Sequence, residues 1–447
     1  MIDIMALSRD TFHKVMPIVF IFVVSWYFFA PGYMSSDSFL QYGSAMAGEY
    51  PDNHPAIMSY LWHYLMYIIP GPQSLLFFHL MLLALGIYFW QDNINSKFSS
   101  YILVLLFIMP WVINFVGVLW KDIGMAFSLL LGTSLLLNSR GNRKIALLSI
   151  PFILYAFAVR YNAILGIVPV VFMGIYYLFP RTSYLRCGMI TCVIVVISFF
   201  CIKFFTYHII HAEKKHYEIL LMGDDIARIS LDTNQEILLN VKKEDLQKCS
   251  SYPILYERAL CFIDKGYDKN GILVVGMPVE DVHKLWLTTV IEHPLTYVNI
   301  KITAFLYFLR SPFMEPVTTW LPGINKNIYH LVVERPELVN KLETYVLGSQ
   351  DTILSEFFKP YLWLLISLTL IPASLLVNSR TARLQIAALN LSSLGYFASL
   401  FLSVPSVDFR YCYWCIIAAT VSIAIFTVEL VSQKKNLVSR HHNQHII

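Results

Sequence analysis

Long apolar runs constrain this chain more than any other feature of its sequence. The clearest are Ile18–Ala30, Leu75–Trp90, Ile145–Val159 and Ile416–Val428. A helix needs about 20 mostly apolar residues to cross a bilayer core about 30 Å thick, and several of these runs reach that length with their flanks. Of the 447 residues, 57% are hydrophobic and 14% are charged, whereas a soluble chain carries about 25% charged residues. The sequence therefore predicts an all-α polytopic membrane protein.

The apolar pattern predicts about ten membrane-spanning helices. We expect them at 14–31, 73–92, 101–119, 123–138, 145–159, 162–179, 187–207, 357–377, 386–404 and 412–431. The first run is interpreted as a membrane helix and not a cleavable signal, because no small-residue cleavage site follows it. Two shorter apolar segments, Pro55–Ile69 and Thr296–Leu309, are expected to lie at the membrane interface. The first has about 15 residues, which rise only about 22 Å in a helix.

Basic residues indicate how these helices are oriented. Short connections rich in Lys and Arg face the cytoplasm in most membrane proteins. Here the basic residues fall in alternate connections, at Lys97, at Arg140, Arg143 and Lys144, at Arg181 and Arg186, and at Arg380 and Arg383. Further basic residues precede the first helix and follow the last. An even number of crossings puts all of them on one side, so we expect both termini in the cytoplasm.

The same pattern divides the chain into four parts. They are an N-terminal transmembrane core at 1–207 with a first outer loop at 32–72, an outer cap region at 208–356, C-terminal transmembrane helices at 357–432 and a cytoplasmic tail at 433–447. The cap region is expected to be a small helical unit. It contains Cys249 and Cys261, the two cysteines that lie in a polar segment. We predict a disulfide between them, with two free buried thiols as the alternative.

Each outward connection carries ionisable residues at a helix boundary. They are Asp37, Glu49, Asp52 and His54 in the first loop, Lys121 and Asp122, Arg160 beside Tyr161, Asp224, Asp225 and Arg310 in the cap region, and Asp408 with Arg410. For any single turn, interfacial anchoring or a local ion pair is as good an explanation as a functional role. Anchoring does not require acids at so many outer turns, and ionisable groups at membrane depth are often functional. The set therefore predicts a polar site at the outer face.

The order of these pieces resembles the GT-C superfamily of membrane glycosyltransferases. The resemblance rests on Asp37 after the first helix, Asp52-Asn53-His54-Pro55, Trp120-Lys121-Asp122, Arg160-Tyr161-Asn162, the segment 225–230 and Asp408-Phe409-Arg410-Tyr411. It implies a GT-C-like fold in a bacterial inner membrane, with the active site facing the periplasm beneath the cap. It also implies a polyprenyl-phosphate-linked sugar donor, a glycan or lipid-linked acceptor and contact with membrane lipid, with no role for nucleic acid.

The resemblance and the residues suggest roles for these side chains. An inverting sugar transfer needs a carboxylate that takes a proton from the acceptor hydroxyl, and Asp37 is the first candidate, followed by Asp52 and Asp122. The departing phosphate needs positive charge, for which Lys121, Arg160, Arg310 and Arg410 are candidates. Other substrate-binding candidates are His54, Tyr161, Asp225 and Asp408. No cofactor is implied. At Asp37 the chain has a single acid where many relatives have an Asp-Glu or Asp-x-Asp pair, so a divalent metal is possible but is not supported by these residues.

Other functions remain open from the sequence. A lipid-linked polysaccharide polymerase or ligase would use similar chemistry on a larger acceptor. A transporter or flippase would need charges or broken helices near the membrane midplane, and few residues meet that requirement. A structural membrane protein would tolerate neutralisation of Asp37. In that case Asp37 would act only as the N-cap of a helix expected to start near Phe39.

Overall fold

Helices make up nearly all regular structure in the described part of the chain. The computed structural model describes residues 9–92, 94, 99–139, 142–237, 243–249, 254, 261, 277–310 and 312–444. Within these ranges, five helical segments are long and apolar enough to cross a membrane, at Gln73–Gln91, Tyr161–Leu178, Tyr184–Ile209, Arg380–Ser403 and Phe409–Lys435. The expectation of an all-α chain with membrane-crossing helices is confirmed in these coarse terms.

The N-terminal half packs around one buried helix, α7 (Lys121–Asn138). Every residue of α7 from Asp122 to Leu137 is buried. Its closest neighbours are α4 (Gln73–Gln91) and α9 (Ile150–Val159). Against α4, the indole Nε1 of Trp90 donates a hydrogen bond to the backbone oxygen of Leu130 (3.1 Å). Outside this core lie α1 (Arg9–Phe29), α5 (Ser99–Phe107), α6 (Pro110–Ile113) and α8 (Arg143–Leu148). α7 is therefore covered on all sides, and its first turn is enclosed by the neighbouring helices.

The C-terminal half joins this core through α10 (Ile164–Leu178), α18 (Pro360–Ala373), α19 (Arg380–Ser403) and α20 (Tyr413–Gln444). Between α10 and α19, Gly166 and Gly395 let the two backbones approach closely. A Cβ on Gly395 would overlap the backbone oxygen of Leu165, and one on Gly166 would lie 3.0 Å from that of Ser392. Small residues serve the same purpose at many membrane helix interfaces.

Two of the ten predicted spans are not single helices. In the segment 101–119, α5 ends at Phe107, Pro110 begins the short α6, and the chain leaves helix from Asn114 onward. Proline lacks the N–H that would continue the α5 ladder. The segment 145–159 divides at Ser149 into α8 and α9, with Pro151 in the first turn of α9. Each of the other eight segments lies largely within one helix.

The two segments expected at the interface are also helical. They form α3 (Ala56–Leu65) and α16 (Pro294–Leu309), and neither is among the five long apolar segments. Another short helix, α2 (Ser36–Ala47), precedes α3 in the first loop and packs against it. The helix α11 (Tyr184–Phe204) leads from the core into the cap region.

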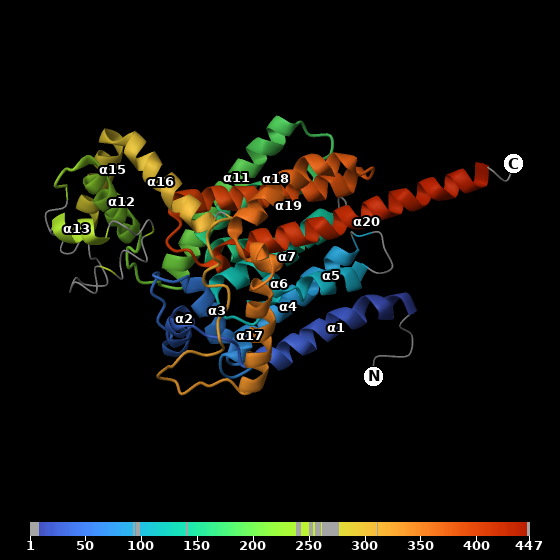
Figure 1. Cartoon of the computed structure of the whole chain (residues 1–447), viewed down its shortest axis with the longest axis horizontal. Helices are drawn as coiled ribbons and strands as arrows, with labels where there is room; N and C mark the ends of the chain where they lie inside the picture. The colour runs from blue at the N-terminus through green and yellow to red at the C-terminus, as the bar shows by residue number, and fades with distance from the viewer. Residues whose placement is uncertain are drawn as a thin grey trace.

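The cap region has a small apolar core of its own. It consists of α12 (Glu218–Thr233), α13 (Lys243–Cys249) and α15 (Val279–Glu292), with Ile226, Leu246 and Val282 buried between them. The Sγ atoms of Cys249 and Cys261 lie 2.02 Å apart beside this core. In Figure 1 these helices lie beyond one end of the helix bundle, while α17 (Pro336–Gln350) lies back against it. Both the start of α1 and the end of α20 lie toward the opposite end.

Candidate functional site

Three extended segments fix the place where the first loop leaves α1. The backbone N–H of Tyr33 donates to the oxygen of Gly117, and the N–H of Leu119 donates back to Tyr33 (both 2.9 Å). On the other side, Met34 exchanges backbone hydrogen bonds with Gly323 and Asn325 (both 3.0 Å). These bonds use the backbone groups that residues 114–120 would otherwise need for a helix. They bring the start of α2 next to the start of α7.

Asp37 lies in the first turn of α2, but it does not cap that helix. The N-cap is Ser35, whose backbone N–H donates to Ser38 Oγ (3.3 Å). The indole Nε1 of Trp120 donates to Ser35 Oγ (2.7 Å), and Ser38 Oγ donates to the backbone oxygen of Leu119 (3.0 Å). The expectation that Asp37 might only cap a helix starting near Phe39 is therefore wrong, because serines hold the helix start. The Asp37 carboxylate is left for other contacts.

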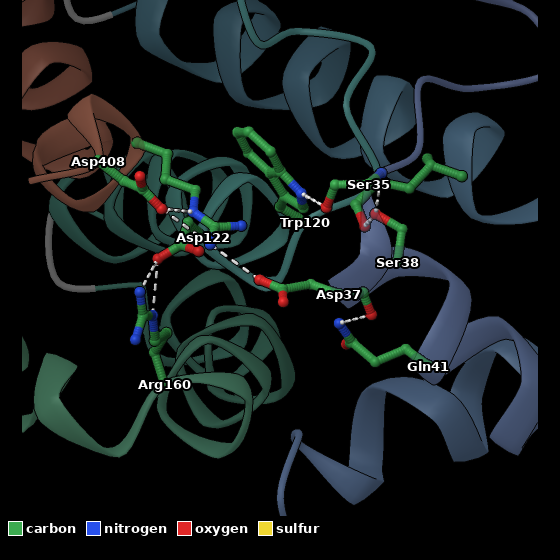
Figure 2. Close-up of polar contacts among 10 residues, drawn as sticks. Ser35, Asp37, Ser38, Gln41, Trp120, Asp122, Arg160 and Asp408 are labelled. Atoms are coloured by element: carbon green, nitrogen blue, oxygen red, sulfur yellow. Dashed lines mark hydrogen bonds and ion pairs between the residues drawn. The ribbon is translucent and has the colours of Figure 1, made fainter. Parts of the chain in front are cut away.

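Asp37 and Asp408 meet at one arginine. Arg410 Nη2 lies 2.8 Å from Asp37 Oδ2 and 3.0 Å from Asp408 Oδ2, and Arg410 Nε also donates to Asp408 Oδ2 (3.1 Å). The Arg410 guanidinium stacks over Trp120, with Cζ 4.2 Å from the ring centroid. Figure 2 shows how Asp37 on α2 reaches toward Asp122 and Asp408. Within the described ranges, Asp37 Oδ1 has no hydrogen-bond donor.

A second carboxylate–arginine pair lies deeper beside the first (Figure 2). Arg160 donates through Nε to Asp122 Oδ1 (2.7 Å), and its Nη2 contacts the same oxygen. The Asp122 side chain is 0% exposed and that of Arg160 is 14% exposed. The other oxygen, Asp122 Oδ2, has no hydrogen-bond partner in the described structure. Arg160 also lies over Tyr411, with Cζ 4.8 Å from the ring centroid.

Lys121 is the cation of this cluster that no carboxylate neutralises directly. Among the described residues, its ammonium group forms neither an ion pair nor a hydrogen bond. Its charge nevertheless acts on the neighbouring groups. Burial raises the pKa of Asp37, but the charges of Arg410, Lys121 and His54 outweigh burial and hold that pKa below its usual value. Asp37 is therefore ionised at neutral pH.

His54 completes the cluster from the first loop. Burial, together with the charge of Lys121, lowers the pKa of His54 to about 4. The imidazole is therefore neutral at neutral pH. Its Nδ1 is buried and has no partner among the described groups. The structure thus brings together Asp37, His54, Lys121, Asp122, Arg160, Asp408 and Arg410, all of which the sequence had singled out.

Asp52 and Tyr161 lie at the edge of this cluster. Asp52 Oδ2 accepts a hydrogen bond from Tyr207 Oη (2.8 Å), and Asp52 Oδ1 accepts one from the backbone N–H of Lys215 (2.7 Å). Both carboxylate oxygens are therefore engaged in joining the first loop to the start of the cap region. The ring of Tyr161 stacks with the ammonium of Lys203, which lies 4.7 Å from its centroid.

Two predicted substrate-binding residues contact other parts of the protein. Asp225 on α12 pairs with Lys301 Nζ through Oδ1 (2.7 Å) and accepts from Trp286 Nε1 through Oδ2 (3.1 Å). Burial raises its pKa although both neighbours bind the carboxylate. Arg310 ends α16 and donates through Nε to the backbone oxygen of Glu315 (2.9 Å). The Asp225 contacts join α12 to α15 and α16, the Arg310 contact is local to the end of α16, and neither residue contacts the Asp37 cluster.

The sequence did not single out Lys203 as a site residue. Its ammonium lies over three aromatic rings, 4.7 Å from Tyr161, 5.7 Å from Phe199 and 5.3 Å from Tyr207. It forms no ion pair within the described part of the chain. The one available signal was a lysine near the end of an otherwise apolar run. The described residues contain no group of three or more His, Cys, Asp or Glu side chains that could hold a metal ion.

Comparisons with known proteins add no family to this description. No protein-family model matches the chain, and the searches of curated proteins and of solved structures found no match.

Proposed function

We propose that the protein is a membrane glycosyltransferase of the GT-C type. It transfers a sugar, with inversion, from a polyprenyl-phosphate donor to a periplasmic acceptor such as a lipid-linked glycan or lipopolysaccharide. In this proposal about ten helices cross a bacterial inner membrane and both termini are cytoplasmic. The observation that carries the proposal is the half-open Asp37 carboxylate, held by Arg410 beside the uncommitted cation Lys121. A carboxylate base and free positive charge are what this transfer requires.

The contacts suggest how the two requirements are linked. The free Oδ1 of Asp37 would take the proton of the acceptor hydroxyl as its oxygen bonds to the anomeric carbon of the sugar. The bond from that carbon to the phosphate oxygen breaks, and the phosphate leaves with the electron pair. Lys121 and Arg410 offset its charge. A donor phosphate bound to Arg410 would weaken the pull of that arginine on Asp37, so the pKa of Asp37 would rise and the base would strengthen.

The arrangement of the helices supports the topology in this proposal. The Asp37 cluster lies where α2 meets the start of α7 and of η6 (Phe409–Cys412), on the side of the bundle that carries the cap helices. The start of α1 and the end of α20 lie toward the other end (Figure 1). An even number of crossings accounts for this placement. A polymerase or ligase would use the same site and would differ in the acceptor.

Asp37→Asn tests the proposal, because asparagine keeps the size of the side chain but cannot act as a base. We expect sugar transfer to fall by about 10²–10⁴-fold, the usual contribution of a general base. The measurement is mass spectrometry of donor and product lipids in membranes that contain the variant. Glu49→Gln is the matched control, since Glu49 is an exposed acid of the same loop.

The result depends on the variant being folded, because Asp37→Asn also weakens the ion pair with Arg410. Thermal unfolding in detergent should show a melting temperature close to that of the wild type. An Asp37→Asn protein with wild-type turnover would exclude Asp37 as the base. Loss of transfer in Glu49→Gln as well would mean that the assay reports loop integrity and not the base.

A further inference from the structure

A cavity of about 480 Å³ lies between α10, α11, α18 and α19, far from the Asp37 cluster. One of its lining residues, Tyr176, follows Tyr161 by 15 residues along the helical segment Tyr161–Leu178, which contains α10. A helix rises about 1.5 Å per residue, so this separation is about 22 Å along the helix. The cavity therefore lies toward the opposite end of the bundle, where α19 begins and α10 ends.

The wall of the cavity changes from charged to apolar with depth. Arg380, Arg383, Leu384 and Ala387 line it from α19, and their spacing of three and four residues puts them on one helix face. Arg380 is at the first position of α19, and Ala387 lies two turns further in. Phe172 on α10 likewise lies one turn deeper than Tyr176. Positive charge thus lines the mouth and hydrocarbon lines the interior.

The charge at the mouth is not balanced by the protein. No Asp or Glu is among the residues that line the cavity. Arg383 Nε is buried and has no hydrogen-bond partner, and Arg383 forms no ion pair in the part of the chain that is described. Arg380 donates through Nη2 to Tyr176 Oη. Arg380 and Arg383 therefore present positive charge that no carboxylate of the cavity wall offsets, so the site favours a ligand that brings an anionic oxygen.

We propose that this cavity binds one anionic phospholipid. Its phosphate accepts hydrogen bonds from Arg383 and Arg380, and its acyl chains begin against Phe172, Leu384 and Ala387. The chains then leave the cavity past the exposed side chain of Leu375 into the bilayer. A lipid of net negative charge fits better than a zwitterionic one, whose ammonium would meet two arginines and no carboxylate. Basic pockets between membrane helices recognise anionic headgroups in this way. The proposal is independent of the proposed sugar transfer.

The test is native mass spectrometry of the full-length protein purified in detergent. Phosphatidylglycerol is compared with phosphatidylcholine of the same chains, and inorganic phosphate forms a third arm. We expect one phosphatidylglycerol to bind each chain, and Arg383→Gln to weaken its binding by about tenfold or more, the effect of losing a hydrogen bond to a charged group. Arg186→Gln should leave binding unchanged, because Arg186 is exposed at the start of α11 and does not line the cavity.

Arg380→Gln keeps the test decisive if Arg383→Gln does not fold, because Arg380 is exposed and its loss leaves the core intact. It should also weaken phosphatidylglycerol binding. Equal retention of phosphatidylglycerol by the wild type and a folded arginine variant would overturn the proposal. Equal binding of phosphatidylcholine would overturn the preference for net negative charge. Displacement of the lipid by millimolar phosphate would assign the site to a free anion instead.

Discussion

At the scale of single residues, the two carboxylate–arginine pairs of the site differ in their access to water. Asp122 is 0% exposed and its partner Arg160 is 14% exposed, whereas Asp37 is 29% exposed. A fully buried pair is weak evidence for net stabilisation, but removal of one partner leaves an uncompensated charge in the core. The Asp122–Arg160 pair therefore orients the start of α7, while the Asp37–Arg410 pair remains accessible to a substrate.

The buried pair makes a quantitative prediction. Arg160→Ala should lower the free energy of unfolding by about 3–5 kcal/mol, because it leaves the buried Asp122 carboxylate without its positively charged partner. The double variant Arg160→Ala with Asp122→Ala should lose less unfolding free energy than the two single variants, Arg160→Ala and Asp122→Ala, lose in total. Thermal unfolding in detergent measures all of these proteins. Arg160→Lys should be intermediate, since a single ammonium replaces the two guanidinium N–H groups that contact Asp122 Oδ1.

Additive losses in this cycle would show that Asp122 and Arg160 do not stabilise each other. The same variants also test the earlier expectation that Arg160 binds the donor phosphate. If Arg160→Lys is as stable as the wild type and as active at low donor concentration, a positive charge at this position is sufficient and the guanidinium fork is not required. Wild-type activity of Arg160→Ala at low donor concentration would exclude Arg160 from binding the donor phosphate.

His54 predicts a pH dependence of stability. Its pKa is about 4 in the folded protein, lowered by burial and by Lys121, against a usual value of 6.5. Between these two pH values His54 is protonated in the unfolded chain but not in the folded chain. The free energy of unfolding therefore falls as the pH falls from about 6.5 toward 4. One group shifted this far accounts for up to about 3 kcal/mol. Asp37 has a lowered pKa, and its contribution to stability is lost only below pH 4.

The check is a comparison of melting temperatures at pH 7 and pH 5. His54→Gln cannot be protonated, so it should lose less stability than the wild type over this interval. His330→Gln serves as the control, because His330 is exposed. If wild type and His54→Gln lose the same stability between the two pH values, His54 is not a buried neutral imidazole.

At the scale of elements, the sequence predicts helices correctly where apolar runs are uniform. The prediction is wrong where tertiary contacts take the backbone hydrogen-bonding groups that a helix would use. Apart from Asn114 the segment 101–119 is apolar, yet it leaves helix after α6, where Gly117 and Leu119 pair with Tyr33. Those hydrogen bonds form between residues more than 80 positions apart, so no local sequence pattern predicts them. The same contacts place Asp37 beside Lys121. The position of each site residue on its own loop was thus predictable, but their pairing was not.

Candidate residues were more predictable than the contacts they make. Asp37 and Arg410 each stand out as a charge at the end of an apolar run, and their meeting requires the whole helical bundle to form. Asp225 and Arg310 stand out equally in the sequence, but their partners are Lys301 and the backbone of Glu315. Charge at an outer turn therefore indicates placement at one face. It does not distinguish a substrate site from an ion pair within the cap.

The crossing of α10 and α19 gives a prediction at this scale. Gly395→Val should be severely destabilising, because its Cβ would overlap the backbone oxygen of Leu165 and a helix backbone cannot move aside. Overpacking typically costs about 1–3 kcal/mol, and a contact with backbone should reach at least the upper end. Gly188→Val in α11 is the matched control, since a Cβ there meets nothing within 4 Å.

Fluorescence-detected gel filtration with a heating step measures both glycine variants. Gly188→Val should melt near the wild-type temperature, and Gly395→Val should melt well below it or fail to yield a monodisperse peak. Equal melting of the two variants would contradict the close approach of α10 and α19.

At the scale of the whole molecule, charge is sorted between the two ends of the bundle. The end beside the cap contains Asp37, Asp122 and Asp408 paired with arginines, and the other end presents Arg380 and Arg383 without acids in the cavity between the helices. Unbalanced positive charge at one end is what the positive-inside tendency predicts for the cytoplasmic face. The cavity and the Asp37 cluster would then face different leaflets, so a lipid in one would not compete with a donor in the other.

This orientation predicts the outcome of cysteine labelling in intact cells. The background is the protein with its five free cysteines replaced and Cys249 and Cys261 retained. Because these two are joined, the background should not react with an impermeant thiol reagent unless it is first reduced. Lys284→Cys adds an exposed thiol on α15 in the cap, and Lys144→Cys adds one on α8 at a basic connection.

Lys284→Cys should therefore react in intact cells whose outer membrane admits the reagent, and Lys144→Cys should react only after the inner membrane is permeabilised. The contrast follows from the basic connections, because moving Arg143 and Lys144 outward would oppose the positive-inside tendency at every later loop. Labelling of Lys144→Cys in intact cells, with Lys284→Cys protected, would show that the protein has the opposite orientation in the membrane. The Asp37 cluster would then face the cytoplasm, where a periplasmic acceptor cannot reach it, and the proposed sugar transfer would fail together with the topology.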